Sequence, residues 1–446
     1  MSKVTHVIKR TGAVVPFNKN RITNAIYRAA VAVGGRDKDK AEMLAEQVVE
    51  LLEEKCPEGC TPSIEEIQDL VEFVLIKNGH DQVSKEYILY RNERNRKRES
   101  ENKYASIPNE NIPWAKIWRV LDWAVSHNLH TTEAYNDRVR KGEFPQIVHE
   151  SESRYEGDIN VAANLILERA KDLKMVFISG PSSSGKTTTT IKVEQRLNKS
   201  GLKFKALNVD HYFFDLELHP KDEFGDYDFE TPQALDLELI NQHLIALSEG
   251  KEIKIPFYDF KEGKRYDNRT PFKLEENEIL LIDSLHGLYP SMSKDIDMEK
   301  KFKLYLEPLL QMKTSKGQYV RWTDLRLMRR MLRDSVHRAY NPTQTLEHWH
   351  YVRGSELRNI IPYVNSTDYI ISSGMPYELS IYKARLLKNF IEWEKNYKNN
   401  PLKADAYTRA ARVLEVMSEI ESVEDETAVP KDSVLREFIG GSILKY

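Results

Sequence analysis

The chain has 446 residues, of which 30% are charged, and a formal net charge of −3. This length predicts about three domains, and the near-neutral charge gives no reason to expect a nucleic-acid partner. No run of about 18 apolar residues could cross a bilayer, so no membrane association is expected.

Two further features favour a cytoplasmic location. The first residues, MSKVTHVIKRTG, lack the apolar core of a secretory signal. Cys56 and Cys60 are the only cysteines, and no histidines cluster beside them. This pattern predicts neither a four-ligand zinc site nor a disulfide scaffold, and it suits a reducing compartment.

Residues 1–99 are predicted to form a small α-rich domain with a β-hairpin. A short alternating strand spans Val4–Lys9, and Asn18 or Asn20 could cap the first helix. A third helix should begin at Ser63, which is placed as an N-cap ahead of first-turn acids.

This first domain resembles the ATP-cone family. The resemblance rests on His6-Val7-Ile8-Lys9-Arg10-x-Gly12…Phe17-x-x-x-Arg21-Ile22-x-x-Ala25-Ile26 and on Tyr87-Ile88-x-Tyr90-Arg91. It implies a regulatory site for ATP or dATP, and it also leaves room for a homo-oligomer. The residues implied at the regulatory nucleotide are Lys9, Arg10, Arg21 and Ile22. The alternative is that the three cations form a solvated face.

Residues 100–170 are predicted to be a helical connector. Trp114, Trp118 and Trp123 suggest a buried helical surface. His127, His130 and His149 have spacings that fit no common metal site, so structural roles are expected for them.

Strand and helix alternate over residues 171–395, which predicts an α/β domain with a parallel sheet flanked by helices. The expected strands are a short one before Gly180, then Phe204–Val209, Glu278–Asp283, Phe302–Leu306 and Tyr369–Ile371. The expected helices are Thr187–Asn198, Leu235–Leu247 and Thr323–Tyr340. Residues 396–446 are predicted to be a helical extension, with Ala404–Glu421 the longer of two helical segments in the tail.

A G-x-x-x-x-G-K-T motif lies between the first of these strands and its helix. Such a loop wraps its backbone N–H groups around phosphates at a helix N-terminus. Lys186 would reach the β- and γ-phosphates, and the Thr187 hydroxyl would ligate Mg²⁺. The residues predicted to bind ATP here are Gly180, Pro181, Ser182, Ser183, Ser184, Gly185, Lys186, Thr187 and Thr188.

Two carboxylates end strands of the predicted sheet. Asp283 follows a continuous apolar strand and suits a second Mg²⁺-holding role. Asp210 ends a strand expected to neighbour the loop, where it could accept a proton from a substrate hydroxyl. A turn or helix-cap role for Asp210 fits the sequence equally well.

A basic helix begins near Asp324. Arg326, Arg330 and Arg333 fall near one of its faces and could stabilise a transferring phosphoryl group. A nucleic-acid groove and a solvated face are the alternatives.

Residues 174–375 resemble the phosphoribulokinase/uridine kinase family. The resemblance rests on the loop together with Val209-Asp210-His211-Tyr212-Phe213, the run from Tyr227 to Asp236, Ile255-Pro256-Phe257-Tyr258-Asp259-Phe260 and Arg329–Asp334. It implies Asp210 as general base with Lys186 and Arg333 as further catalytic groups, and Arg338 as a second cation over ATP. It places Tyr212, Glu230, Tyr258 and Arg330 on the substrate side.

Two departures fall on the acceptor side. Gly263 stands where these kinases usually carry a histidine, and Tyr340 stands where they carry another lid arginine. The expected function is therefore an ATP- and Mg²⁺-dependent small-molecule kinase, most like uridine/cytidine kinases, regulated through residues 1–99. The alternatives are a kinase for another hydroxylated metabolite such as a sugar phosphate, a non-catalytic nucleotide sensor, and a nucleic-acid-stimulated ATPase.

Overall fold

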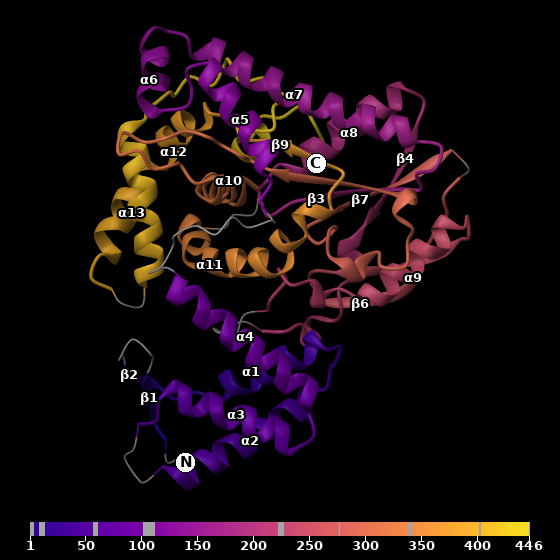
Figure 1. Ribbon diagram of the computed structural model, residues 1–446, viewed down its shortest axis with the longest axis vertical. Coiled ribbons are helices and arrows are strands. Elements are labelled where there is room, and N and C mark those ends of the chain that lie inside the picture. Colours follow the sequence, from indigo (N-terminus) through magenta and orange to yellow (C-terminus); the bar gives the residue numbers. More distant parts are fainter. Residues whose placement is uncertain are drawn as a thin grey trace. The chain divides into compact units, whose positions relative to one another are not determined.

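The computed structural model describes residues 4–8, 14–56, 61–100, 112–221, 227–275, 277–337, 341–400 and 403–445 (Figure 1). The chain divides into two compact units. The first comprises Met1–Pro108, Tyr212–Leu237 and Pro256–Asp267, and the second comprises Asn109–His211, Glu238–Ile255 and Asn268–Tyr446.

The N-terminal part of the first unit is the α-rich domain that the sequence predicts. Strands β1 (His6–Ile8) and β2 (Val14–Pro16) form an antiparallel pair. The helices are α1 (Lys19–Ala32), α2 (Lys38–Lys55), α3 (Ile64–Lys77) and α4 (Asp81–Ser100). Their apolar faces enclose one core that includes Ile26, Ala45, Val48, Val74 and Leu75.

The ends of these helices follow local rules. Asn18 caps α1, and Ser63 caps α3 in a reciprocal capping box with Glu66. Cys56, just after α2, is disulfide-bonded, whereas the sequence suggested reduced thiols.

The rest of the first unit is an irregular segment closed by backbone hydrogen bonds. The Asp236 N–H donates to the Tyr212 carbonyl at 2.9 Å, and the Leu216 N–H donates to the Gly263 carbonyl at 2.7 Å. Strands β5 (Ile253–Asp259) and β6 (Lys264–Phe272) form a two-stranded sheet, and its Pro256–Asp267 portion belongs to this unit.

The second unit contains a five-stranded parallel sheet, which confirms the predicted α/β class. Its order is β4-β7-β3-β8-β9. The bounds are β3 (Met175–Ser179), β4 (Lys203–Asn208), β7 (Glu278–Ser284), β8 (Lys301–Glu307) and β9 (Tyr369–Ser372). One expectation was wrong, because β4, which leads to Asp210, pairs with β7 and not with the loop strand β3. Strand order depends on long-range packing that local sequence patterns do not encode.

Helices surround this sheet. They are α5 (Trp114–Ser126), α6 (Thr132–Arg140), α7 (Phe144–Arg169), α8 (Lys186–Lys199), α9 (Leu237–Ser248), α10 (Trp322–His337), α11 (Pro342–Asn359), α12 (Glu378–Tyr397), α13 (Ala404–Glu419) and α14 (Arg436–Ile439). Helix α8 contacts β3, β4 and β7 directly, and α7 packs along α8 (Figure 1). The phosphate-loop helix is therefore held between the sheet and α7.

Two expectations about the helices were wrong. Trp114 and Trp118 are 54% and 65% exposed, and the residues that α5 buries are Val120 and Ala124. In the tail, α12 is longer than α13, and the chain after α13 is largely irregular. In the described part of the chain, no helix combines the length and apolarity needed to cross a membrane. The expected domain boundaries at residues 99, 170 and 395 stay predictions.

Candidate active site

The phosphate loop joins β3 to α8 through two positions that need glycine. A Cβ on Gly180 would lie 2.5 Å from the Leu306 carbonyl oxygen. Gly185 has a φ of +91°, and a Cβ there would lie 2.5 Å from Val434 Cγ2. Ser183 also adopts a left-handed φ of 59°. Left-handed residues in such a loop turn successive N–H groups toward one centre and create an anion-binding concavity.

The side chains of this loop fit a phosphate group. The hydroxyls of Ser183 and Ser184 are buried, and neither has a hydrogen-bond partner within the described residues. A buried polar group without a partner costs about 1–3 kcal/mol, so a ligand with acceptor oxygens would satisfy both. Lys186 Nζ donates to the carbonyls of Gly180, at 2.9 Å, and Pro181, at 3.4 Å, which keeps its charge over the loop.

Three acidic residues from different elements influence this end of the sheet: Asp283 on β7, Asp210 just after β4 and Glu437 on α14. The sheet register aligns Asp283 with Ile178, next to the end of β3. Burial raises the pKa of Asp283 to about 6; Lys186 opposes this shift, and Glu437 and Asp210 add to it. Asp283 therefore senses one cation and two further acids near the C-terminal end of its strand. Thr187, which is exposed, and Asp283 are the residues that would hold Mg²⁺.

The arginines of α10 divide into two groups. Arg326 and Arg329 are fully buried and do not form a lid. Arg326 pairs with Glu307 and Glu356 and donates to the Ser182 carbonyl at 3.1 Å. Its guanidinium therefore connects the phosphate loop to the acidic groups beneath it.

Arg329 braces the next part of the loop. Its guanidinium pairs with Glu378 at 2.6 Å and donates to the carbonyls of Ser184, at 3.3 Å, and Ser373, at 2.7 Å. Burial lowers the pKa of Arg329, but Glu378 more than offsets this effect, so the Arg329 guanidinium stays charged. The cation holds loop carbonyls in place, so that the loop N–H groups can point the other way.

The second group of arginines is partly exposed. Arg330 donates to the Ser182 hydroxyl at 3.2 Å, and Arg333 pairs with Asp334 at 3.0 Å. Arg330, expected on the substrate side, thus contacts the phosphate loop. Arg338 and Tyr340 lie outside the described residues.

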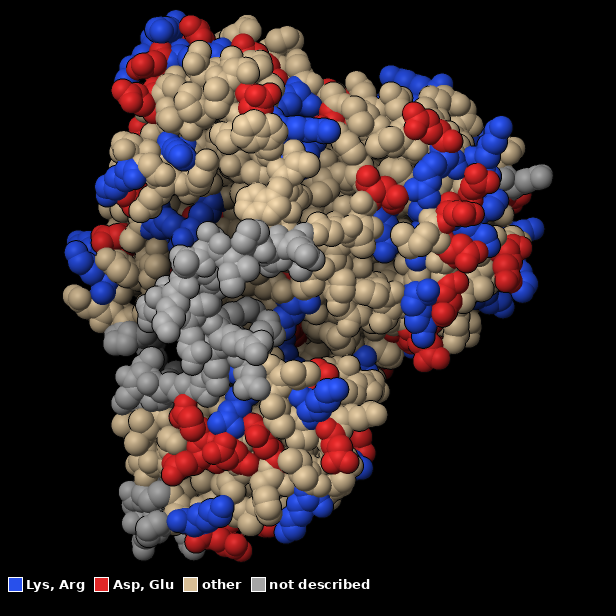
Figure 2. Space-filling view, viewed as in Figure 1, with Lys and Arg blue, Asp and Glu red and all other residues tan. Residues whose placement is uncertain are grey.

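Because two arginines of α10 are buried and paired, the helix does not offer the continuous basic face that a nucleic-acid groove needs. Basic and acidic side chains are also interspersed over the face in Figure 2.

The other predicted substrate residues lie in the first unit. Tyr212 and Tyr258 are buried, and burial raises the pKa of both hydroxyls. Glu230 is half-buried, and its N–H donates to Asp228 Oδ1 at 3.0 Å. An aromatic cluster surrounds Tyr258; its other members are Phe213, His219, Phe229 and Phe260.

Gly263 has a structural reason to lack a side chain. Its φ is +65°, and a Cβ would lie 2.7 Å from Leu216 Cβ. A histidine at this position would be strained and would collide with Leu216. The departure from the usual kinase pattern is therefore built into the local backbone.

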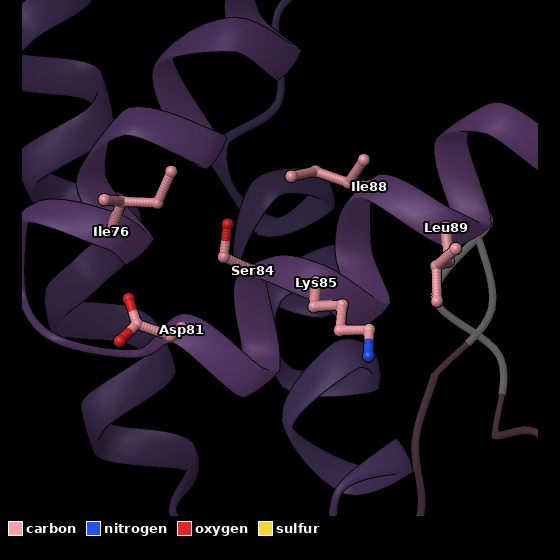
Figure 3. A pocket seen from close by; sticks show the side chains of 6 residues that line it. All are labelled: Ile76, Asp81, Ser84, Lys85, Ile88 and Leu89. Carbon is pink, nitrogen blue, oxygen red and sulfur yellow. The ribbon is translucent and has the colours of Figure 1, made fainter.

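The predicted regulatory residues are only partly described. Lys9 and Arg10 lie outside the described residues, Arg21 is exposed, and Ile22 is buried in the domain core. A separate cavity of about 350 Å³ lies between α3 and α4 (Figure 3). It is lined by Ile76, Asp81, Ser84, Lys85, Ile88 and Leu89. None of the predicted regulatory residues lines it.

Comparison with known families agrees with this architecture. Residues 5–96 match the ATP cone domain, and residues 175–380 match the Phosphoribulokinase / Uridine kinase family. The chain therefore carries an ATP cone domain followed by a domain that matches the Phosphoribulokinase / Uridine kinase family.

Individual relatives match one domain or the other. Over 101 residues the chain is 46% identical to a vitamin B12-dependent ribonucleoside-diphosphate reductase of Thermoplasma acidophilum. This match covers 22% of this chain and only 13% of the reductase. Over 201 residues it is 27% identical to a uridine kinase of Deinococcus deserti, covering 45% of this chain and 87% of that kinase. A uridine kinase of Schizosaccharomyces pombe is 26% identical over 215 residues, covering 47% of this chain and 43% of that kinase.

Sequence reasoning missed the acidic partners of the site. Glu356, Glu378 and Glu437 come from separate elements far along the chain, and no local pattern marks them. The one available signal was the number of arginines in an amphipathic helix, because arginines that face a core must find carboxylates there.

The Arg329–Glu378 pair gives a testable stability effect. Arg329→Met leaves a buried, unpaired carboxylate and should lower the free energy of unfolding by about 3–5 kcal/mol. The double variant Arg329→Met/Glu378→Gln removes the charge as well, so it should be clearly more stable than the single variant. Urea unfolding of the three proteins measures this order, and a single variant as stable as the wild type would contradict it.

His219 gives a pH-dependent effect. Burial lowers its pKa to about 4, although its Nε2 donates to the Phe214 carbonyl at 2.8 Å. The unfolded chain therefore binds more protons than the folded chain between about pH 6.5 and 4. The free energy of unfolding should therefore decrease as the pH is lowered through that window, by about 2 kcal/mol at pH 5 relative to pH 7. Urea unfolding of His219→Gln should lack this component, and parallel pH profiles for variant and wild type would refute the assignment.

Proposed function

We propose that this protein is an ATP-dependent kinase that phosphorylates a hydroxyl group of a small metabolite, with uridine or cytidine as the leading acceptor. The observation that carries the proposal is the phosphate loop. Within the described part of the chain, the buried hydroxyls of Ser183 and Ser184 have no hydrogen-bond partner. Lys186 lies over the loop, and its charge acts on Asp283. The match of residues 175–380 to a kinase family supports the same reaction.

Each charged group then has a role. Asp210 would take the proton from the acceptor hydroxyl as its oxygen attacks the γ-phosphorus, while the bond from that phosphorus to the ADP oxygen breaks. Lys186 and Arg333 would stabilise the charge spread over the transferring group, with Arg338 above the ATP phosphates. Mg²⁺, held by Thr187 and Asp283, would neutralise phosphate charge when bound.

Tyr212, Glu230, Tyr258 and Arg330 are proposed to position the acceptor. A second acceptor class is favoured by one observation. Gly263 cannot carry the base-reading histidine of the uridine kinases without strain, so a sugar phosphate or related hydroxylated metabolite is the second candidate.

We propose that the ATP cone domain regulates this reaction through ATP or dATP bound near Lys9, Arg10, Arg21 and Ile22. A direct contact supports such coupling within the first unit. Arg28 of α1 pairs with Asp228, and Asp228 also accepts from the Glu230 N–H. Tyr27 of the same helix donates to the Leu218 carbonyl at 3.0 Å.

Arg36, which follows α1, reinforces this contact. Its guanidinium lies 4.1 Å from the centre of the Phe214 ring and donates to the Gln233 carbonyl. A nucleotide that moves α1 would therefore move the segment that carries Glu230. Regulation should act on the acceptor more than on ATP.

The kinase proposal predicts turnover that depends on Asp210. Purified full-length protein with ATP and Mg²⁺, screened against nucleosides, sugars and sugar phosphates, should release ADP with at least one acceptor. Asp210→Asn should lower kcat by about 10²–10⁴-fold and leave ATP binding intact. Nucleotide binding without transfer to any acceptor would favour a non-catalytic sensor instead.

The regulatory proposal predicts that Arg28 transmits the signal. In the wild type, dATP should change the acceptor KM about fivefold or more, a typical coupling between sites. Arg28→Ala should largely abolish this change and leave the ATP KM unaltered. Lys19→Ala, on the same helix but paired with Glu46, is the matched control. An undiminished dATP response in Arg28→Ala would rule out this route.

A further inference from the structure

The C-terminal segment Pro430–Ile439 forms one wall of the phosphate loop. Val434 and Phe438 are fully buried, and Val434 Cγ2 fills the space where a Cβ on Gly185 would lie. Arg329, which braces the loop, lies with its guanidinium 4.9 Å from the centre of the Phe438 ring. The segment is therefore packed against the loop through buried side chains.

This segment places a carboxylate on the first turn of α8. Glu437 Oε2 accepts from the Thr188 N–H at 3.1 Å and from the Thr188 hydroxyl at 2.8 Å. Glu437 is 8% exposed and Thr188 is fully buried. Because Gly185 precedes the helix and has no side chain to cap it, the distant glutamate satisfies donors that an N-cap would normally serve.

The same donors belong to the anion-binding end of the helix. In a loop of this type, the backbone N–H groups and the helix dipole bind the phosphates of a nucleotide. A carboxylate and a phosphate oxygen cannot share the Thr188 donors, and two negative groups at that distance repel each other. Glu437 also adds to the rise in the pKa of Asp283, as expected of an anion close to the loop.

The anchoring of the segment shows which part can move. Asp432 pairs with Lys192 of α8 at 2.9 Å, and Ser433 hydrogen-bonds to Glu152 of α7. Because these contacts hold the backbone, release of the carboxylate from Thr188 would take place through rotation of the Glu437 side chain.

We propose that Glu437 is an internal competitor for the phosphate site and sets the affinity of the loop for nucleotide. Its carboxylate accepts from both Thr188 donors in this structure and would turn away when phosphate oxygens bind there. This inference rests on the part of the proposed function in which the loop binds nucleotide, but not on phosphoryl transfer.

Calorimetric titration of the full-length protein with ATP and Mg²⁺ tests the proposal. The binding event lost in Lys186→Ala is assigned to the loop, which separates it from any site in the ATP cone domain. Glu437→Gln keeps the shape and an acceptor oxygen for Thr188 but removes the charge. It should tighten binding at the loop about tenfold, the order expected when one nearby like charge is removed.

Glu426→Gln is the matched control. Glu426 lies in the same tail and pairs with Arg385 and Arg436, so its charge is removed without touching the loop. The affinity of the Glu426→Gln protein for ATP should stay within about twofold of that of the wild type. Unchanged or weaker binding in Glu437→Gln would overturn the proposal and leave Glu437 a static helix cap.

If no binding event is lost in Lys186→Ala, both this inference and the proposed function fail. If binding tightens in Glu437→Gln but no acceptor is phosphorylated, only the proposed function fails.

Discussion

The candidate site depends on two buried arginines that hold the carbonyl side of the phosphate loop. Arg326 and Arg329 donate to the carbonyls of Ser182 and Ser184, and carboxylates behind them keep both guanidinium groups charged. A loop whose carbonyls are fixed in this way must present its N–H groups to the opposite side, where phosphates would bind. Replacing Arg326 would remove the cation paired with the buried Glu307, and replacing Arg329 would remove the cation paired with the buried Glu378, so stability and loop geometry are linked.

The front of the loop has the opposite arrangement. There Lys186 is the cation, and Asp283, Asp210 and Glu437 are acids that influence one another through space. An excess of acids beside a phosphate-binding loop is unfavourable for a nucleotide unless a metal ion or a moving side chain compensates. Mg²⁺ held by Thr187 and Asp283 would supply the compensating positive charge, and rotation of Glu437 would remove one of the acids from the loop.

The parts of this site that could be predicted from sequence are those with a local signature. The loop with its strand and helix follows from a short pattern, as does the Ser63 N-cap elsewhere in the fold, and the position of Asp283 on a sheet strand follows from a continuous apolar run. The strand order could not be predicted, since nothing in β4 indicates that it pairs with β7. The contact of Glu437 with Thr188 could not be predicted either, because the two residues are 249 positions apart in the sequence. The prediction that Trp114 and Trp118 are buried was wrong for another reason. Aromatic residues favour burial on average, but the exposure of one helix face depends on which elements pack against it.

The most direct test of the account is a crystal structure of the full chain with Mg²⁺ and a non-hydrolysable ATP analogue. The account predicts that phosphate oxygens accept from the hydroxyls of Ser183 and Ser184. It also predicts that Lys186 Nζ leaves the Gly180 carbonyl for a phosphate and that Glu437 no longer contacts Thr188. A structure in which the phosphates lie elsewhere, with Lys186 and Glu437 unchanged, would contradict it.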